Sequence, residues 1–123
     1  MNIQFVDTKV INLNLTGIVE ENIESIDDFN FSFTPAFSEF PSNEFLIIFS
    51  LSLKIEDSFV LSIEYAARFS TDDEIDEVFK ESNFVKINAP AIAYPFLRAY
   101  ISNLTLNSGF SPVILPTINF TKF

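Results

Sequence analysis

The sequence predicts an α+β fold, in which a four-stranded antiparallel sheet carries one main helix packed on it. Two long stretches, residues 43–56 and 59–69, alternate apolar and polar side chains, as half-buried antiparallel strands do. A third stretch, which ends at Gly109, places apolar residues three and four positions apart, and this is the period of a helix. The length of 123 residues suits a single domain, residues 1–123.

The first two predicted strands are shorter or less regular than the central pair. Residues 2–15 hold most of their apolar residues on one side, interrupted by charged ones, and Gly17 ends this strand. The apolar set is Ile3, Phe5, Ile11, Leu13 and Leu15. Residues 29–33 alternate phenylalanine with polar residues, and this short strand is expected to stop at Pro35, because proline cannot donate to the ladder of a sheet.

The two central strands are expected to form a hairpin. Both place their odd-numbered residues on the buried face, so two residues that oppose each other must both be odd. The simplest solution sets Ile55 opposite Phe59 across a three-residue loop. Such a loop needs a left-handed residue, usually glycine, and here Asp57 or Ser58 would have to take that conformation.

The main helix is expected to open with two prolines and to end at Gly109. Pro90 and Pro95 suit the first turn, where a missing N–H costs nothing, and Asn88 is a suitable cap. Glycine readily takes the left-handed conformation that ends helices. The polar side of the helix is narrow, so we expect it to be covered on two faces. The apolar stripe consists of Leu97, Tyr100, Ile101 and Leu104, widened by Ile92 and Phe96.

Apolar surface is expected to remain outside the core. Residues 110–120 form an extended apolar segment, because Pro112 and Pro116 exclude both a helix and a central strand. The chain also holds 16 Phe and 3 Tyr, which is a heavy aromatic content for one small core. Exposed apolar surface of this kind marks an oligomer interface or a ligand groove.

The composition excludes several classes of function. The chain has no Cys and no His, so it lacks a thiolate nucleophile, disulfides, the commonest general base and the commonest transition-metal ligand. Only two glycines are present, and these form no phosphate-binding loop. We therefore expect a protein that is not an enzyme and that uses no cofactor and no metal.

The charge pattern narrows the choice of partner. A formal net charge of −10, with seven scattered basic residues, argues against nucleic acid. Ten of the 17 acidic residues fall in residues 20–28 and 72–77, which we interpret as solvated loops, since the second lacks the spacing of a calcium loop. No signal peptide or membrane-length apolar run is visible, so we expect a cytoplasmic protein without membrane insertion.

Residues 89–120 carry a recognisable order of motifs. They read Tyr-Pro-Phe-Leu-Arg, then Ile and Leu at helical spacing, then Gly-Phe, Pro, alternating aliphatics, Pro and Ile-Asn-Phe. This order resembles the C-terminal signature of the SecB family of bacterial export chaperones. The residues that match as structural motif positions are Pro95, Arg98, Gly109, Pro112, Pro116 and Asn119. Arg98 is expected to pair with a carboxylate at an interface.

The resemblance implies an ATP-independent holdase, which binds unfolded polypeptides such as preproteins and keeps them from folding or aggregating before export. Members of the family are tetramers, built as dimers of dimers, whose main helices lie between sheets. A homotetramer of this kind would explain the narrow polar side of the helix. It would also repeat weak sites, so that a long client is held by avidity.

The client groove is expected to be built from phenylalanines. Phe37 and Phe40 suit this role best, because their proline and polar neighbours are unlike those of a core strand. The strand residues have an equal alternative as plain core, since ordinary sheets bury alternating aromatics. The candidates are Phe29, Phe31, Phe33, Phe37 and Phe40 for one wall, and Phe110 and Phe120 for the other.

Two departures from the family count against an association with SecA. Family members continue into a second C-terminal helix and an acidic tail that contacts the SecA motor, whereas this sequence stops at Phe123 and that helix is missing. Where the family carries exposed carboxylates on the sheet, this chain has Val10, Asn14 and Ser62. Two alternatives therefore stay open: a SecB-like chaperone dedicated to one partner, such as an antitoxin, and an oligomeric module that binds a lipid or another small ligand.

Overall fold

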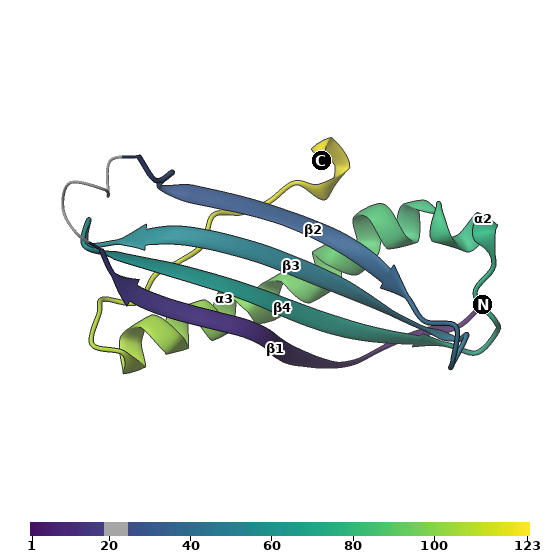
Figure 1. Ribbon diagram of the computed structural model, residues 1–123. Coiled ribbons are helices and arrows are strands. Elements are labelled where there is room, and N and C mark those ends of the chain that lie inside the picture. The colour runs from purple at the N-terminus through teal and green to yellow at the C-terminus, as the bar shows by residue number, and fades with distance from the viewer. Residues whose placement is uncertain (19–24) are drawn as a thin grey trace.

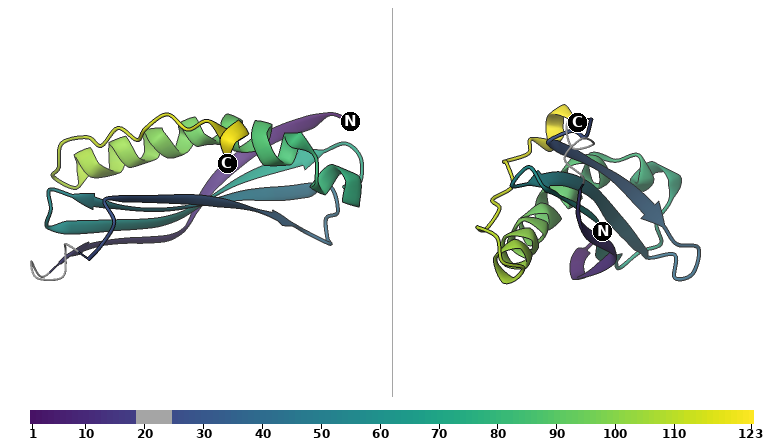
Figure 2. Two further views of the ribbon diagram at one scale, coloured as in Figure 1. Left: turned by 90° about the horizontal axis from the view of Figure 1, so that it is seen from above. Right: turned by 60° about the vertical axis from the view of Figure 1, so that its left-hand side comes forward.

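The computed structural model describes residues 1–18 and 25–123, which form a four-stranded sheet with a helical layer on one of its faces (Figures 1 and 2). The elements, in chain order, are β1 (Ile3–Gly17), β2 (Phe29–Phe37), β3 (Glu44–Ile55), β4 (Phe59–Thr71), the short helix α2 (Glu77–Lys80), the π-helix η1 (Phe84–Asn88), α3 (Ala89–Asn107) and the 3-10 turn η2 (Phe120–Lys122). The predicted fold class is confirmed.

The sheet is antiparallel throughout, with the order β1-β4-β3-β2, so β1 and β2 are its edges. Ile55 lies opposite Phe59, as predicted. Of the two residues predicted as alternatives, Asp57 takes the left-handed conformation, and Glu56 takes it as well. The N–H of Ser58 donates to the C=O of Ile55, which closes a type I′ turn, and that turn requires positive φ at both central residues.

Strand β1 contains two irregularities that explain its uneven sequence pattern. Its register with β4 shifts between Phe5 and Asp7 and again between Val10 and Asn12. Each bulge adds one unpaired residue, which reverses the alternation of side chains. The prediction that Ile11 lies on the buried side is therefore wrong, because it is 52% exposed, and Val10 instead lies opposite the buried Tyr65.

Strand β2 continues through Pro35 to Phe37, which corrects the predicted stop. The N–H of Lys54 donates to the C=O of Asp28, so the even-numbered positions of β2 make the ladder with β3. The odd-numbered positions, Pro35 among them, direct their backbone groups away from the sheet. A proline is tolerated there because an outward position on an edge strand needs no N–H.

The core lies between the sheet and α3. It takes the odd-numbered residues of β3 and β4, as the alternation predicts, together with one face of the helix. The fully covered helix residues include Ala93, Leu97 and Ile101. Behind them, residues 110–119 run back in an extended conformation alongside the helix (Figure 2). We call these residues the returning segment. Apart from the three-residue turn η2, the described residues after α3 form no further helix.

The start of α3 differs from the prediction, whereas its end agrees. η1 runs directly into α3, so Asn88 is already helical and its side chain makes no capping hydrogen bond. Pro90 lies in the first turn as expected, but Pro95 lies inside the helix, on its exposed side. Gly109 has φ of 96° and ends the helix with two backbone hydrogen bonds, Gly109 N–H to Leu106 C=O and Phe110 N–H to Thr105 C=O.

Candidate functional site

Aromatic rings gather where the outer side of β2 meets the C-terminal turn η2. Phe33 lies 5.5 Å from Phe120 and 5.3 Å from Phe123 between ring centroids, and Phe31 lies 5.6 Å from Phe123. Beside these rings is a hollow of about 280 Å³. We call this site the β2 groove. It is lined by Phe33, Asn83, Lys86, Ile87, Phe120, Thr121 and Phe123.

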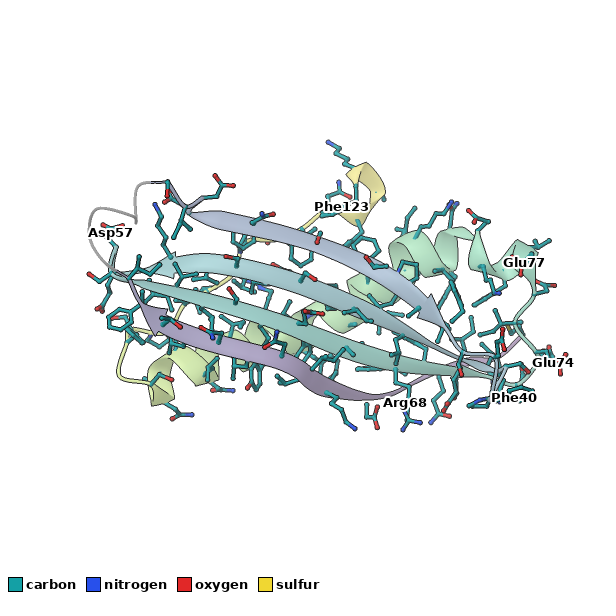
Figure 3. All side chains as sticks on the ribbon, viewed as in Figure 1. Phe40, Asp57, Arg68, Glu74, Glu77 and Phe123 are labelled. Carbon is teal, nitrogen blue, oxygen red and sulfur yellow. The ribbon has the colours of Figure 1, made fainter. Side chains whose placement is uncertain are left out.

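The rings of the β2 groove pass from the core to solvent. Phe120 is buried and touches Tyr94, with a centroid separation of 5.7 Å. Phe31 and Phe33 are half-buried. Phe123, which lies at the C-terminal turn (Figure 3), is 62% exposed. An apolar guest that reaches this site would therefore meet aromatic surface without any opening of the core.

The far wall of the β2 groove is fixed by hydrogen bonds between α3 and the returning segment. The buried Thr105 hydroxyl accepts from the N–H of Val113 at 2.9 Å and donates to the C=O of Ile101. The Tyr94 hydroxyl donates to the C=O of Pro116 at 2.5 Å. Burial raises the pKa of Tyr94 above its ordinary value, with a smaller opposing effect from Arg98, so the hydroxyl stays a donor at neutral pH.

The turn that carries Phe120 is capped by a motif residue. The Asn119 side chain accepts hydrogen bonds from the backbone N–H and the hydroxyl of Thr121, at 3.0 and 2.6 Å. Leu115, between the two motif prolines, is buried and anchors the extended segment. Asn119, Pro112 and Pro116 thus lie in the segment whose path sets the position of Phe120.

The structure brings together only part of the predicted phenylalanine set. Phe31, Phe33 and Phe120 converge in the β2 groove, and Phe29 stacks on Phe31 at 6.4 Å. Phe37 lies farther along β2, where it packs against Phe45. The groove also contains residues that the sequence reasoning missed, chiefly Phe123, Lys86 and Ile87.

Two other predicted groove residues lie apart. Phe40, in the connection between β2 and β3, is 92% exposed and lies away from η2 (Figure 3). Phe110 packs on Phe59 at 5.1 Å, beside the hairpin that joins β3 and β4. The expectation that Phe110 and Phe120 form one wall is therefore corrected, because the extended segment between them runs back along α3 and separates them.

Arg98 is half-buried on α3, and no described carboxylate lies within ion-pair distance of it. Its expected partner at an interface stays a prediction. The fully formed charge network lies instead on the open face of the sheet. There Arg68 makes a two-pronged contact with Asp7, at 3.0 and 2.8 Å, and another with Glu44 at 2.8 Å. The hydrogen bonds from Arg68 hold the pKa of Asp7 below its usual value.

The open face of the sheet is mostly polar at one end. Asn14 and Ser62 lie opposite each other there, whereas Val10 lies on the covered side, opposite Tyr65. The described acidic residues of 25–28 and 72–77 are all exposed. Within residues 1–18 and 25–123, no group of three or more acidic side chains is placed to hold a metal ion. No helix of this part of the chain is long and apolar enough to span a membrane.

Comparison with known protein families identifies a match that covers most of the chain. Residues 28–123 match the family model described as preprotein translocase subunit SecB. The chain is 37% identical over 65 residues to the protein-export protein SecB of Anaplasma phagocytophilum, which covers 52% of this chain and 41% of the relative. It is 33% identical over 81 residues to SecB of Roseobacter denitrificans, which covers 63% of this chain and 48% of that protein.

Other similar proteins extend the comparison. An uncharacterized protein of Methanocaldococcus jannaschii is 37% identical over 83 residues, which covers 63% of this chain and 52% of the relative. The matched stretches thus span about half of these relatives or less. Among solved structures, a SecB-like chaperone of Mycobacterium tuberculosis, in complex with a peptide from an antitoxin, superposes with a TM-score of 0.70 at 17% identity, covering 95% of this chain and 91% of that one.

Proposed function

We propose that this chain, which belongs to the SecB family, acts as an ATP-independent holdase that binds unfolded polypeptide segments. Family membership supports a role as a chaperone in protein export. SecB proteins are chaperones and not enzymes, so the prediction that the chain is not an enzyme is confirmed at the level of the family. The proposal also includes that the clients are preproteins and that they are bound in the cytoplasm.

The observation that carries the proposal is the combination of an aromatic groove with an open strand edge. Phe29, Phe31 and Phe33 occupy outward positions of β2, so their backbone N–H and C=O groups face away from β3. An extended client segment could pair with these groups as an added strand, and its alternate side chains would enter the groove. Pro35 has no N–H, so it limits this pairing to the first half of β2.

A chaperone dedicated to one partner is a second candidate, favoured by one specific observation. The SecB-like chaperone of Mycobacterium tuberculosis was solved with a peptide from an antitoxin. The presence of Asn14 and Ser62 on the open face, in place of carboxylates, also favours a partner other than SecA. A sedimentation assay with purified SecA and this protein distinguishes between the two candidate functions. A complex would support general export, and its absence would favour the dedicated role.

The proposal includes assembly into a homotetramer, built as a dimer of dimers. The side of α3 that faces away from the sheet exposes Ile92 and Leu106, which are 44% and 55% exposed. The flank of the helix adds Phe96, which is 49% exposed although its ring also contacts Phe5 of β1. A second copy that covers this side would remove their surface from water. Light scattering after size exclusion tests this directly. A mass near 56 kDa, four times 14.0 kDa, is expected, and a mass near 14.0 kDa would contradict it.

The holdase proposal is tested by the suppression of aggregation without nucleotide. An unfolded protein that aggregates on dilution should stay soluble at a near-stoichiometric amount of this chain. A variant with both Phe31→Ser and Phe33→Ser should lose most of this activity, whereas Val78→Ser should keep it, because Val78 is 80% exposed on α2, outside the groove. Full activity in the double variant would overturn the assignment of the site. A chain that carries bound lipid and leaves aggregation unchanged would instead favour a small-ligand module.

A further inference from the structure

The chain is firmly anchored as far as Phe120. The returning segment is held by the Tyr94 hydroxyl, which donates to the C=O of Pro116, and by the side chain of Leu115, which is 2% exposed. Phe120 itself is 6% exposed and packs against Tyr94. This part of the chain is therefore tied to α3 by hydrogen bonds and by burial in the core.

The residues after Phe120 are held differently. The N–H of Thr121 donates to the side chain of Asn119, and the N–H of Lys122 donates to the C=O of the same residue. Both hydrogen bonds stay within the turn η2 and its cap. In residues 1–18 and 25–123, no hydrogen bond or ion pair joins residues 120–123 to β2, η1 or α3. The last residues of η2 can therefore move without breaking a polar contact to another element.

Phe123 is held over the edge strand by ring contacts alone. Its ring lies 5.6 Å from Phe31, 5.3 Å from Phe33 and 5.8 Å from Phe120 between centroids. Figure 3 shows this side chain beside the outer edge of β2. Aromatic contacts of this kind are individually weak, and most of the Phe123 side chain remains in water. Other apolar groups can therefore exchange with it.

The place that Phe123 takes is the place that a client side chain would need. A client strand added to the outer edge of β2 would set its own side chains opposite Phe31 and Phe33, with Cβ atoms about 5 Å apart. These two residues point to the same face of the sheet, about 7 Å from each other along the strand. Because the ring of Phe123 already contacts both, the ring and an apolar client side chain exclude each other.

We propose that Phe123 is an internal competitor of the client, whose ring fills the apolar site beside Phe31 and Phe33 in the free protein and is displaced when a client enters. This inference rests on the proposed function of the β2 groove and adds how that groove is regulated. Phe120 stays in place as the anchor, so residues 121–123 move. The competition lowers the apparent affinity for clients, because only molecules with an open site can bind. It also covers the rings of an edge strand until a client arrives.

Peptide binding measured by fluorescence anisotropy tests the inference. The probe is a neutral labelled peptide that alternates Phe with Ser. Phe123→Ser should bind it about three- to tenfold more tightly than the wild type, which corresponds to a site that is open in roughly 10–30% of wild-type molecules. The matched control is Phe40→Ser, which makes the same change at an exposed phenylalanine between β2 and β3 and should bind as the wild type does.

The possible failures of this experiment are distinct. Unchanged binding in Phe123→Ser would overturn the inference and leave the holdase proposal intact. Weaker binding would also overturn the inference, because Phe123 would then be a fixed part of the client site. Failure of both the wild type and the variant to bind the peptide would overturn the groove as a client site, and the inference with it.

A fluorescent side chain at the same position reports the movement directly. The chain contains no Trp, so Phe123→Trp introduces a single reporter. Addition of the unlabelled peptide should shift the emission to longer wavelength, since the indole leaves the ring cluster for water. A shift to shorter wavelength would mean that the indole closes over the guest, and no shift at saturating peptide would mean that it stays in place. Either result would overturn the inference.

Discussion

Strands β2 and β3 have the same kind of sequence pattern but differ in how completely their phenylalanines are buried. Both alternate phenylalanine or aliphatic residues with polar ones over much of their length. In β3, Phe45 and Phe49 are 1% and 0% exposed. In β2, Phe29 is 37% exposed, and Phe31 and Phe33 are only half-buried. The difference arises because β3 has a strand on each side and lies under the helical layer, whereas β2 is an edge.

Alternation therefore specifies which side of a strand is apolar, but not how completely that side is covered. On a central strand the apolar side becomes core. At an edge the same side stays accessible from the flank, beside backbone groups that have no partner strand. In this chain the second situation creates the β2 groove, with η2 as its far wall. Four predictions test how separable the core and the edge are.

The largest effect is expected from truncation of the central strand. Phe49→Ala should lower the free energy of unfolding by about 3–5 kcal/mol, because it leaves a cavity in a closed core. Phe33→Ala on β2 should lower it by only about 1 kcal/mol, since its ring is half-buried. Denaturant unfolding at a fixed protein concentration measures both values. Similar losses in the two variants would show that β2 is part of the core, and that the comparison between the strands fails.

Loss of one buried hydroxyl should loosen the far wall of the groove. Thr105→Val removes the acceptor for the N–H of Val113 and should cost about 1–3 kcal/mol, the penalty of a buried unpaired group. Thr105→Ser keeps the hydroxyl and is the matched control. Amide exchange at Val113 should accelerate in the Val variant and stay slow in the Ser variant. Slow exchange in both would mean that packing of Leu115, and not this hydrogen bond, holds the segment.

Local patterns in the sequence predict most of the fold. The register of the central hairpin follows from the parity of its odd-numbered residues, and the end of α3 follows from Gly109. The misses fall where long-range context decides. Pro35 was expected to stop β2, yet an outward position on an edge accepts proline. Asn88 was expected to be a cap, yet η1 already supplies helical backbone ahead of it.

The candidate site was harder to predict than the fold. The sequence singles out Phe31, Phe33 and Phe120 but cannot show that Phe110 lies elsewhere, because the path of the segment between the two phenylalanines depends on tertiary contacts with α3. Phe123 lies three residues after Phe120, and this proximity was a usable signal. The sequence contains no such signal for Lys86, because its position at the groove depends on contact between η1 and β2, which are far apart in the chain.

A smaller effect is expected at the turn that starts the returning segment. Gly109→Ala should cost about 1–2 kcal/mol, because φ of 96° is strained for a residue with a Cβ. The added Cβ meets nothing within 4 Å, so the cost is purely one of backbone conformation. Gly17→Ala is the control, since its Cβ would make only an ordinary contact with the Phe59 ring at 3.5 Å. Equal thermal stability of the two variants would contradict this account.

The smallest effect is expected at the other edge of the sheet, where Asp7 of β1 meets Arg68 of β4. Because hydrogen bonds from Arg68 hold the pKa of Asp7 below 3.8 in the folded state, the contact stabilises the fold fully above that pH. This stabilisation is lost as the pH falls through the lower, folded pKa. Asp7→Asn should therefore be slightly less stable than the wild type at pH 7, and the difference should narrow toward pH 3.

The control for this prediction removes the partner instead. Arg68→Gln should abolish the same part of the pH dependence, so that the Asp7→Asn change no longer alters it in that background. Client binding at the β2 groove should be unchanged in both variants, because β3 lies between this contact and β2. A loss of binding on Asp7→Asn would show that the two edges of the sheet are coupled, and the groove could then no longer be treated as a local property of one edge strand.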